Sequence, residues 1–136
     1  DKDNNLSYVS EESYTSEMVK AQNELVEKNK ARGMHMEIHA SKKGPRMHAR
    51  LCGELDHHSA EQARNMLDTM LHDITIRDLT LDLSGVTFMD SAGLGVILGR
   101  YRILSLRGGK LTVCGMSSAI DRIFRMSGLY AIVDRQ

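Results

Sequence analysis

The sequence contains no tryptophan, one proline and two cysteines, and its charges cancel. Because 18 basic side chains balance 18 acidic ones, the overall charge does not attract nucleic acid or an anionic membrane surface. No apolar run approaches the ~18 residues of a membrane-spanning helix, and no basic-then-apolar leader opens the chain. We therefore expect a cytoplasmic protein that contacts neither nucleic acid nor membrane directly, and whose partners are other proteins.

Both cysteines stand in apolar, strand-like runs. Free cysteine in such a position usually behaves as a small buried hydrophobe, so Cys52 and Cys114 are expected to be inert core thiols. The length of 136 residues is that of one ordinary domain. We therefore expect a single hydrophobic core.

Residues 1–33 differ in composition from the rest of the chain. They are rich in Ser, Asn, Glu and Lys, and a weak helical pattern follows a possible N-cap at Ser16. Too few positions are apolar to bury much surface, which is typical of a flexible segment. We predict a flexible or partly helical extension over residues 1–33 and one folded domain over residues 34–136.

From residue 34 onward, strand and helix patterns alternate. The pattern predicts a hairpin that turns at Gly44-Pro45, followed by helices that begin near residues 59, 91 and 118 and strands over 78–85, 110–116 and 131–134. Ser59 to Gln62 fits a capping box at the first of these helices. Strands that alternate with helices form parallel crossovers. We therefore predict an α/β fold with a mixed, mostly parallel sheet that opens with the hairpin and carries the helices.

Asp90 and Ser91 stand at the junction between a strand and a helix. The carboxyl edge of such a sheet is where ligands and partners usually bind. One interpretation is that Ser91 only caps the helix. Against it, Gly93 and Gly95 weaken the first helical turn, and a helix N-terminus favours added negative charge. Ser91 is therefore also a good acceptor for a phosphate, which would add about two negative charges beside Asp90.

Three stretches resemble the STAS family, and within it the anti-sigma factor antagonists of sporulation: "GELDHHSAEQAR", "FMDSAGLGVILGRYR" and "GGKLTVCGMSSAIDRIFRMSGL". The resemblance covers residues 34 to about 134. It implies the STAS fold and a switch protein rather than an enzyme. The unphosphorylated form would bind an anti-sigma factor that is also a serine kinase with bound ADP or ATP, and would thereby free the sigma factor.

The resemblance also implies roles for individual residues. Ser91 directly follows the aspartate of "MDS". The resemblance implies that the kinase phosphorylates this serine and that a PP2C-type phosphatase removes the phosphate. The residues expected at the partner-binding surface are Asp56, His57, Asp90, Ser91, Gly93, Leu94 and Gly95. Two departures stand out: Ala92 replaces a second serine that is common in the family, and the chain stops at Gln136, where family members continue into a C-terminal helix.

Other functions are weaker interpretations of the same residues. Glu54, Asp56, His57 and His58 form the densest group of candidate metal ligands, but adjacent histidines on an extended loop point apart. "GLGVILG" has its third glycine one position late for a dinucleotide site, and Ser91 lacks the upstream glycine of a hydrolase elbow. We therefore predict no metal, no cofactor and no catalytic residue.

Two further expectations remain. A STAS module that acts as a scaffold or small-ligand binder in another signalling assembly is the alternative function, and the N-terminal extension favours it.

Five arginines are expected to lie solvated on helix faces, with one or two free to meet an acidic partner: Arg100, Arg102, Arg107, Arg122 and Arg125.

Overall fold

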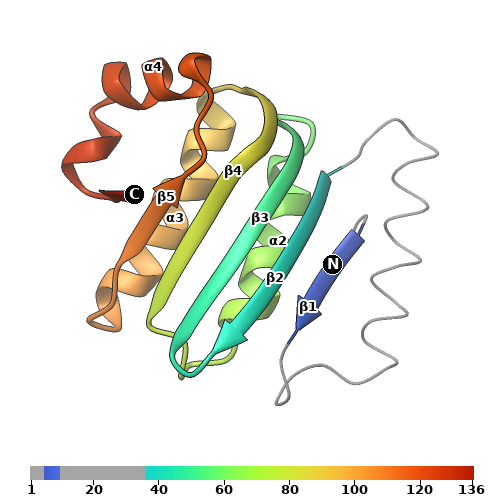
Figure 1. The fold of residues 1–136 in the computed structure, drawn as a ribbon, viewed down its shortest axis with the longest axis vertical. Coiled ribbons are helices and arrows are strands. Elements are labelled where there is room, and N and C mark those ends of the chain that lie inside the picture. The colour runs from blue at the N-terminus through green and yellow to red at the C-terminus, as the bar shows by residue number, and fades with distance from the viewer. Residues whose placement is uncertain (1–4, 10–35) are drawn as a thin grey trace.

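The computed structural model describes residues 5–9 and 36–136, and its centre is one six-stranded sheet (Figure 1). The strands lie side by side in chain order: β1 (Asn5–Val9), β2 (Met36–Lys43), β3 (Arg46–Leu55), β4 (Asp78–Met89), β5 (Leu111–Cys114) and β6 (Asp134–Arg135). The pair β2–β3 is antiparallel and every other pair is parallel. The predicted α/β fold with a mixed, mostly parallel sheet is confirmed.

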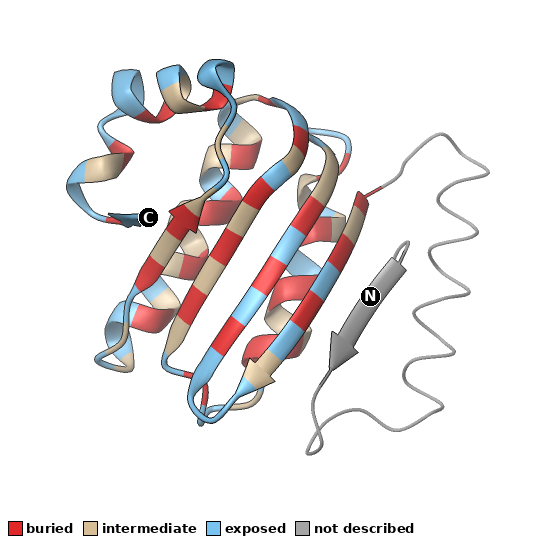
Figure 2. Ribbon diagram, viewed as in Figure 1, coloured by how far each residue is buried: buried red, intermediate tan, exposed pale blue. Residues whose placement is uncertain are grey.

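The hairpin also forms at the residues where it was predicted, although β1 and not the hairpin lies at the edge of the sheet. Strands β2 and β3 pair from Met36 with Gly53 to Lys43 with Arg46. Gly44 adopts a φ of 59° in the turn between them, which a residue without a Cβ adopts at little cost. The alternation of buried and exposed residues along both strands turns one face of the sheet toward the core (Figure 2).

Two helices cover that apolar face, α2 (Ala60–Leu71) and α3 (Ser91–Leu106), and the view in Figure 1 shows both on one side of the sheet. Apolar side chains form the core between the two layers. Its largest buried side chains include those of Met36, Ile38, Leu51, Leu55, Met66, Leu67, Met70, Leu79, Leu81 and Leu83. Helix α4 (Ser118–Ser127) follows β5 and packs Ile120 and Phe124 into the same core.

Strand β4 and the last strand differ from the prediction. Strand β4 continues to Met89 rather than ending near residue 85. Two register shifts opposite the stretch between Arg50 and Glu54 of β3 each add one extra residue in β4, and the strands stay paired beyond them. The strand predicted over residues 131–134 is wrong. A 3₁₀ helix, η1 (Leu129–Ala131), precedes the last strand, and only Asp134–Arg135 pairs with β5.

The chain before residue 36 contributes one element that its composition did not predict. Strand β1 pairs in parallel with β2 from Asn5 with Glu37 to Val9 with Ser41. The helix predicted after Ser16 lies outside the described residues. The division into an extension over residues 1–33 and a domain over residues 34–136 stays a prediction.

The capping box predicted at Ser59 is wrong, although α2 does begin directly after that residue. The Ser59 hydroxyl donates to the Glu54 carbonyl at 2.5 Å and accepts the Asp56 amide at 3.1 Å. Its side chain makes no cap hydrogen bond to α2. The Asp56 carbonyl instead accepts the amides of Ser59 and Ala60. Ser59 therefore closes the loop between β3 and α2.

Three of the five arginines expected in solvent have structural partners. Arg100, 6% exposed, forms an ion pair with Asp68 across α2 and α3 at 3.1 Å. The Arg107 guanidinium donates to the carbonyls of Leu71, Asp73 and Ile76.

The third of these arginines lies on α4, where Arg125 donates to Asp121 at 2.7 Å.

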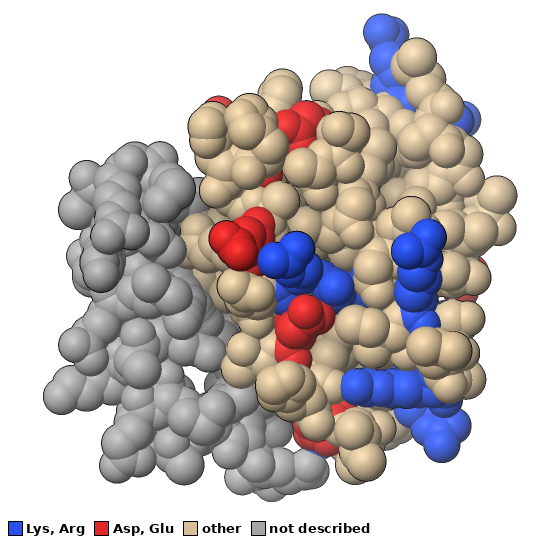
Figure 3. Space-filling model, turned by 180° about the vertical axis from the view of Figure 1, so that it is seen from behind, with Lys and Arg blue, Asp and Glu red and all other residues tan. Residues whose placement is uncertain are grey.

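Figure 3, which views the helix-covered side, shows acidic and basic side chains mixed on this face. Charge of neither sign dominates that face, which fits the zero net charge of the chain. None of the helices among residues 36–136 is long and apolar enough to cross a membrane.

Candidate functional site

Asp90 joins three segments at the carboxyl edge of the sheet. Strand β4 ends at Met89, and Asp90 is the N-cap of α3 with extended backbone angles. Its Oδ1 accepts the amides of Ala92 at 2.9 Å and Gly93 at 3.2 Å, while its Oδ2 accepts the His57 amide at 3.0 Å. One carboxylate therefore holds the first turn of α3 and the loop that follows β3 together.

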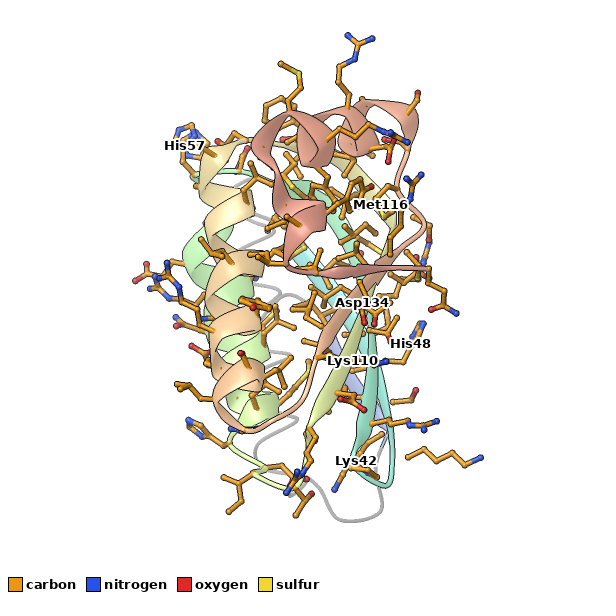
Figure 4. All side chains as sticks on the ribbon, turned by 90° about the vertical axis from the view of Figure 1, so that its left-hand side faces the viewer. Lys42, His48, His57, Lys110, Met116 and Asp134 are labelled. Atoms are coloured by element: carbon orange, nitrogen blue, oxygen red, sulfur yellow. The ribbon has the colours of Figure 1, made fainter. Side chains whose placement is uncertain are left out.

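The His57 side chain lies beside the same carboxylate. Its Nδ1 is 3.2 Å from Asp90 Oδ2, and the imidazole is 69% exposed. Figure 4 shows His57 at the end of the molecule where α3 begins, well away from the face of the sheet opposite α2 and α3 (the open face). Two elements that are 33 residues apart in sequence thus present one polar surface.

These contacts set the protonation of Asp90. Partial burial raises the pKa of the carboxyl group, but the hydrogen bonds from Gly93, from the side chain and amide of His57, and from Ala92 outweigh it. The net effect is a pKa below the ordinary value of 3.8. Asp90 therefore stays ionised and keeps accepting hydrogen bonds at neutral pH.

Ser91 is the first residue of α3 and is exposed. The interpretation that Ser91 only caps the helix is wrong, because the preceding Asp90 fills the cap position and already accepts the Ala92 and Gly93 amides. The Ser91 hydroxyl has no hydrogen-bond partner among the described residues. It is therefore free for chemistry with another molecule.

Asp56 is buried beside the site and hydrogen-bonds to the loop that carries His57. The residue is only 9% exposed, and its Oδ1 accepts the amides of His58 at 2.9 Å and Ser59 at 3.1 Å. The carboxylate thereby fixes the loop that carries His57. The structure brings Asp56 close to Asp90 through this loop, but gives it a positioning role rather than an exposed surface.

The two glycines of the first helical turn have different roles. A Cβ on Gly93 would overlap the Leu55 carbonyl oxygen and approach the Met89 Cγ to 2.8 Å. Gly93 is buried and lets α3 pack against the end of β3. A Cβ on Gly95 would meet nothing within 4 Å, and this residue is exposed. Leu94, between them, is half-buried against the core.

Residues 37–135 of the chain match the STAS domain family. The chain belongs to the STAS family.

Proteins similar to this STAS domain have related names. An anti-sigma F factor antagonist of Paenibacillus polymyxa is 42% identical over 84 residues, which cover 62% of this chain and 72% of that protein. An anti-sigma-B factor antagonist of Staphylococcus aureus is 31% identical over 96 residues, covering 71% and 88%. The solved structure of the Bacillus cell fate determinant SpoIIAA in its phosphorylated form matches with a TM-score of 0.59 at 29% identity, covering 73% and 90%.

The residue pattern alone did not point to Phe88, which also belongs to this edge of the STAS domain. Its side chain is 50% exposed although it lies near the end of an apolar strand, and it pairs with Glu54 of β3. The sequence predicts a strand only to residue 85, so the alternation of Leu79, Leu81 and Leu83 gives no face for residue 88, which the structure places in β4. An exposed phenylalanine two residues before Asp90 adds apolar surface to the site.

The metal ligands considered in the sequence do not converge on one point. Asp56 Oδ1 is occupied by two backbone amides, and His57 lies against Asp90. The His57 and His58 rings contact each other, with centroids 3.9 Å apart. Within residues 36–136, the candidate group of metal-ligating side chains lies elsewhere on the sheet.

The contrast between the two glycines gives a stability prediction. Gly93→Ala should lower the free energy of unfolding by about 1–3 kcal/mol, because the added methyl overpacks the contact with Leu55. Gly95→Ala should raise it by up to about 1 kcal/mol, because alanine favours the helix and meets no neighbour. Urea unfolding of the parent and both variants, followed by circular dichroism, measures both changes. Equal stability of the parent and Gly93→Ala would contradict the close packing of α3 on β3.

Proposed function

We propose that this STAS domain is an anti-sigma factor antagonist whose binding is switched by phosphorylation of Ser91. The observation that carries the proposal is the exposed, unbonded Ser91 hydroxyl next to a helix cap made entirely by Asp90. Relatives named anti-sigma F and anti-sigma-B factor antagonists support the class of function. The phosphorylated form of SpoIIAA supports control by a phosphate.

The position of Ser91 allows phosphorylation without unfolding. The hydroxyl is exposed at the first helical position, and the α3 cap does not use it. A kinase can therefore reach the oxygen while Asp90 keeps its hydrogen bonds to Ala92 and Gly93. The acceptor is unambiguous within this turn, because the neighbouring position 92 is alanine.

The phosphate would change the charge of the surface rather than its fold. A phosphoserine adds about two negative charges at neutral pH, directly beside the ionised Asp90 carboxylate. The partner surface would be complementary to the single negative charge of the unmodified site. After phosphorylation, acidic groups of the partner would be repelled, or the added negative charges would be left unpaired in the interface. The unphosphorylated protein therefore binds the partner, and the phosphorylated protein releases it.

The proposed docking surface combines polar and apolar residues at the carboxyl edge. His57, Ser91 and Gly95 are exposed there, Leu94 and Asp90 are half-buried, and Phe88 contributes apolar area. Asp56 and Gly93 hold this surface in shape, as their burial and contacts indicate. The flat helical turn at Gly95 lets a partner backbone approach closely, since no side chain projects from it.

The partner is an anti-sigma factor that is also a serine kinase with bound ADP or ATP, and a PP2C-type phosphatase restores the hydroxyl. Such a cycle takes place in the cytoplasm, where sigma factors act. The chain itself needs no catalytic residue, cofactor or metal for this role, since both covalent steps belong to its partners.

Phosphorylation is tested by intact-protein mass. After incubation with an anti-sigma factor kinase and Mg-ATP, the parent should gain one phosphate of about 80 Da, and Ser91→Ala should gain none. Ser118→Ala is the matched control, because Ser118 is also an exposed serine at the first position of a helix. Its variant should gain the same mass as the parent. If the parent gains no mass from a kinase that modifies a known antagonist, the switch proposal fails.

Substitutions at two glycines of α3 whose added Cβ would meet no neighbour, Gly95 and Gly99, test the docking surface separately. Gly95→Gln should weaken binding to the ADP-bound anti-sigma kinase by more than about tenfold, equivalent to about 1.4 kcal/mol, because the side chain would project into the interface. The fold should persist, since nothing lies within 4 Å of the new Cβ. Isothermal titration calorimetry measures the affinity.

The control for this prediction is Gly99→Gln, one turn further along α3. A Cβ on Gly99 would also meet nothing within 4 Å, so the substitution has the same chemistry outside the proposed contact. Its affinity should remain within about threefold of the parent, a difference of less than about 0.7 kcal/mol. Unchanged affinity of a folded Gly95→Gln protein would remove the first turn of α3 from the docking surface.

The alternative function is a STAS module that serves as a scaffold or small-ligand binder. A hollow of about 600 Å³ on the open face of the sheet is the structural feature that favours it. Cationic Arg46, Lys110 and Arg135 and acidic Asp78 and Asp134 line this hollow. Failure of the chain to bind any anti-sigma kinase, with the fold intact, would favour this alternative.

A further inference from the structure

We propose that His48, Asp82 and Cys114 form a binding site for a zinc-class transition-metal ion on the open face of the sheet. The proposal does not depend on the antagonist function, because this site and the start of α3 occupy different faces. Figure 4 shows His48 on the side of the sheet away from α2 and α3, while His57 lies at the end of the molecule. No residue of the docking surface takes part in the trio.

The sheet register brings the three residues together from separate strands. Asp82 of β4 pairs with Cys114 of β5, so their side chains leave the same face at the same level. His48 of β3 pairs with Thr80, which precedes Asp82 by two residues and therefore shares its face. The residues are 34 and 32 positions apart in sequence, which is why the local pattern did not predict a metal site.

The separation of the three side chains suits a metal ion. One imidazole nitrogen, one carboxylate oxygen and one thiol sulfur all lie within 4.8 Å of one another. Zinc binds nitrogen, oxygen and sulfur at about 2.0–2.3 Å in a tetrahedron, so modest side-chain rotations would bring all three into its shell. The mixed nitrogen, oxygen and sulfur set favours Zn²⁺ or Co²⁺ over Mg²⁺ or Ca²⁺, which prefer oxygen alone.

Asp82 is already held in position. Its Oδ1 accepts the Ser84 amide at 2.9 Å. The neighbouring cation, Arg50, donates to the Ser84 hydroxyl at 3.2 Å. Gly115 leaves room for the carboxylate, because a Cβ there would lie 2.5 Å from Asp82 Oδ1. The carboxylate is thus oriented by backbone groups, as ligating carboxylates commonly are.

The trio does not suit nucleophilic catalysis. Burial, and secondarily the charge of Asp82, raise the pKa of the Cys114 thiol, so it is protonated at neutral pH and is a weak nucleophile. Metal binding changes this state: the S–H bond breaks, the sulfur–metal bond forms, and the proton leaves to solvent. Three protein ligands leave a fourth position for water or for a ligand atom of another molecule.

The experiment is a titration of the full chain with Co²⁺, followed by Zn²⁺ displacement. Cobalt bound to a thiolate gives a sulfur-to-metal charge-transfer band in the near ultraviolet, which reports the cysteine directly. The parent should develop this band to saturation at one ion per chain and lose it when Zn²⁺ is added. Cys114→Ser should lack the band, and Cys52→Ser should keep it.

His48→Gln and Asp82→Asn test the other two ligands. Each should weaken Co²⁺ binding by at least about tenfold, since even changes outside the ligand shell commonly cost about 10–100-fold. Asparagine keeps an acceptor for the Ser84 amide, so the loss would not come from a disordered strand. Circular dichroism of each variant confirms the fold.

Two results would overturn the proposal. One is a parent protein without a charge-transfer band at saturating Co²⁺. The other is a band that survives in Cys114→Ser and disappears in Cys52→Ser, which would place the ion at the other cysteine. Neither result bears on Ser91 phosphorylation, so failure of the metal site and failure of the antagonist function are distinguishable.

Discussion

The functional edge of this protein depends on the hydrogen bonds of one carboxylate. Asp90 accepts amides from the first turn of α3 and from the loop after β3, so it joins two segments that are distant in sequence. Hydrogen bonds to an ionised acceptor are stronger than neutral ones. The same bonds lower the pKa of Asp90. The negative charge of Asp90, its capping of α3 and the position of the loop after β3 therefore all depend on the same hydrogen bonds.

This arrangement separates structural residues from surface residues within a few positions. Asp90 satisfies the helix start, so Ser91 is left exposed with an unbonded hydroxyl. Gly93 is small because α3 packs against Leu55, whereas Gly95 is small where nothing in the described chain requires it. A glycine that the fold does not need at this position supports the proposed partner contact. The proposed switch therefore acts at Ser91 and Gly95, on a frame fixed by Asp56, Asp90 and Gly93.

Much of the fold could be predicted from the sequence because its determinants are local. The hairpin turn at Gly44-Pro45 and the helix starts near residues 59, 91 and 118 depend on local sequence, and the structure confirms them. The Ser59 capping box failed because the hydroxyl bonds to Glu54 at the end of β3 and to Asp56 of the following loop. The trio of His48, Asp82 and Cys114 depends on strand register, which no local pattern specifies. The site residues around Ser91 came from the family resemblance, and their roles in binding stay predictions.

The most direct test of the central claim is a nuclear magnetic resonance titration of the Asp90 carboxyl carbon. Because backbone amides and His57 stabilise the ionised form, the carboxyl group of the folded protein should protonate only below the ordinary pKa of 3.8. The midpoint should move up toward that value in His57→Ala, which removes the imidazole contact but keeps the backbone amide. A midpoint at or above 3.8 in the folded parent would show that Asp90 does not hold the two segments together, and would contradict the account of the site.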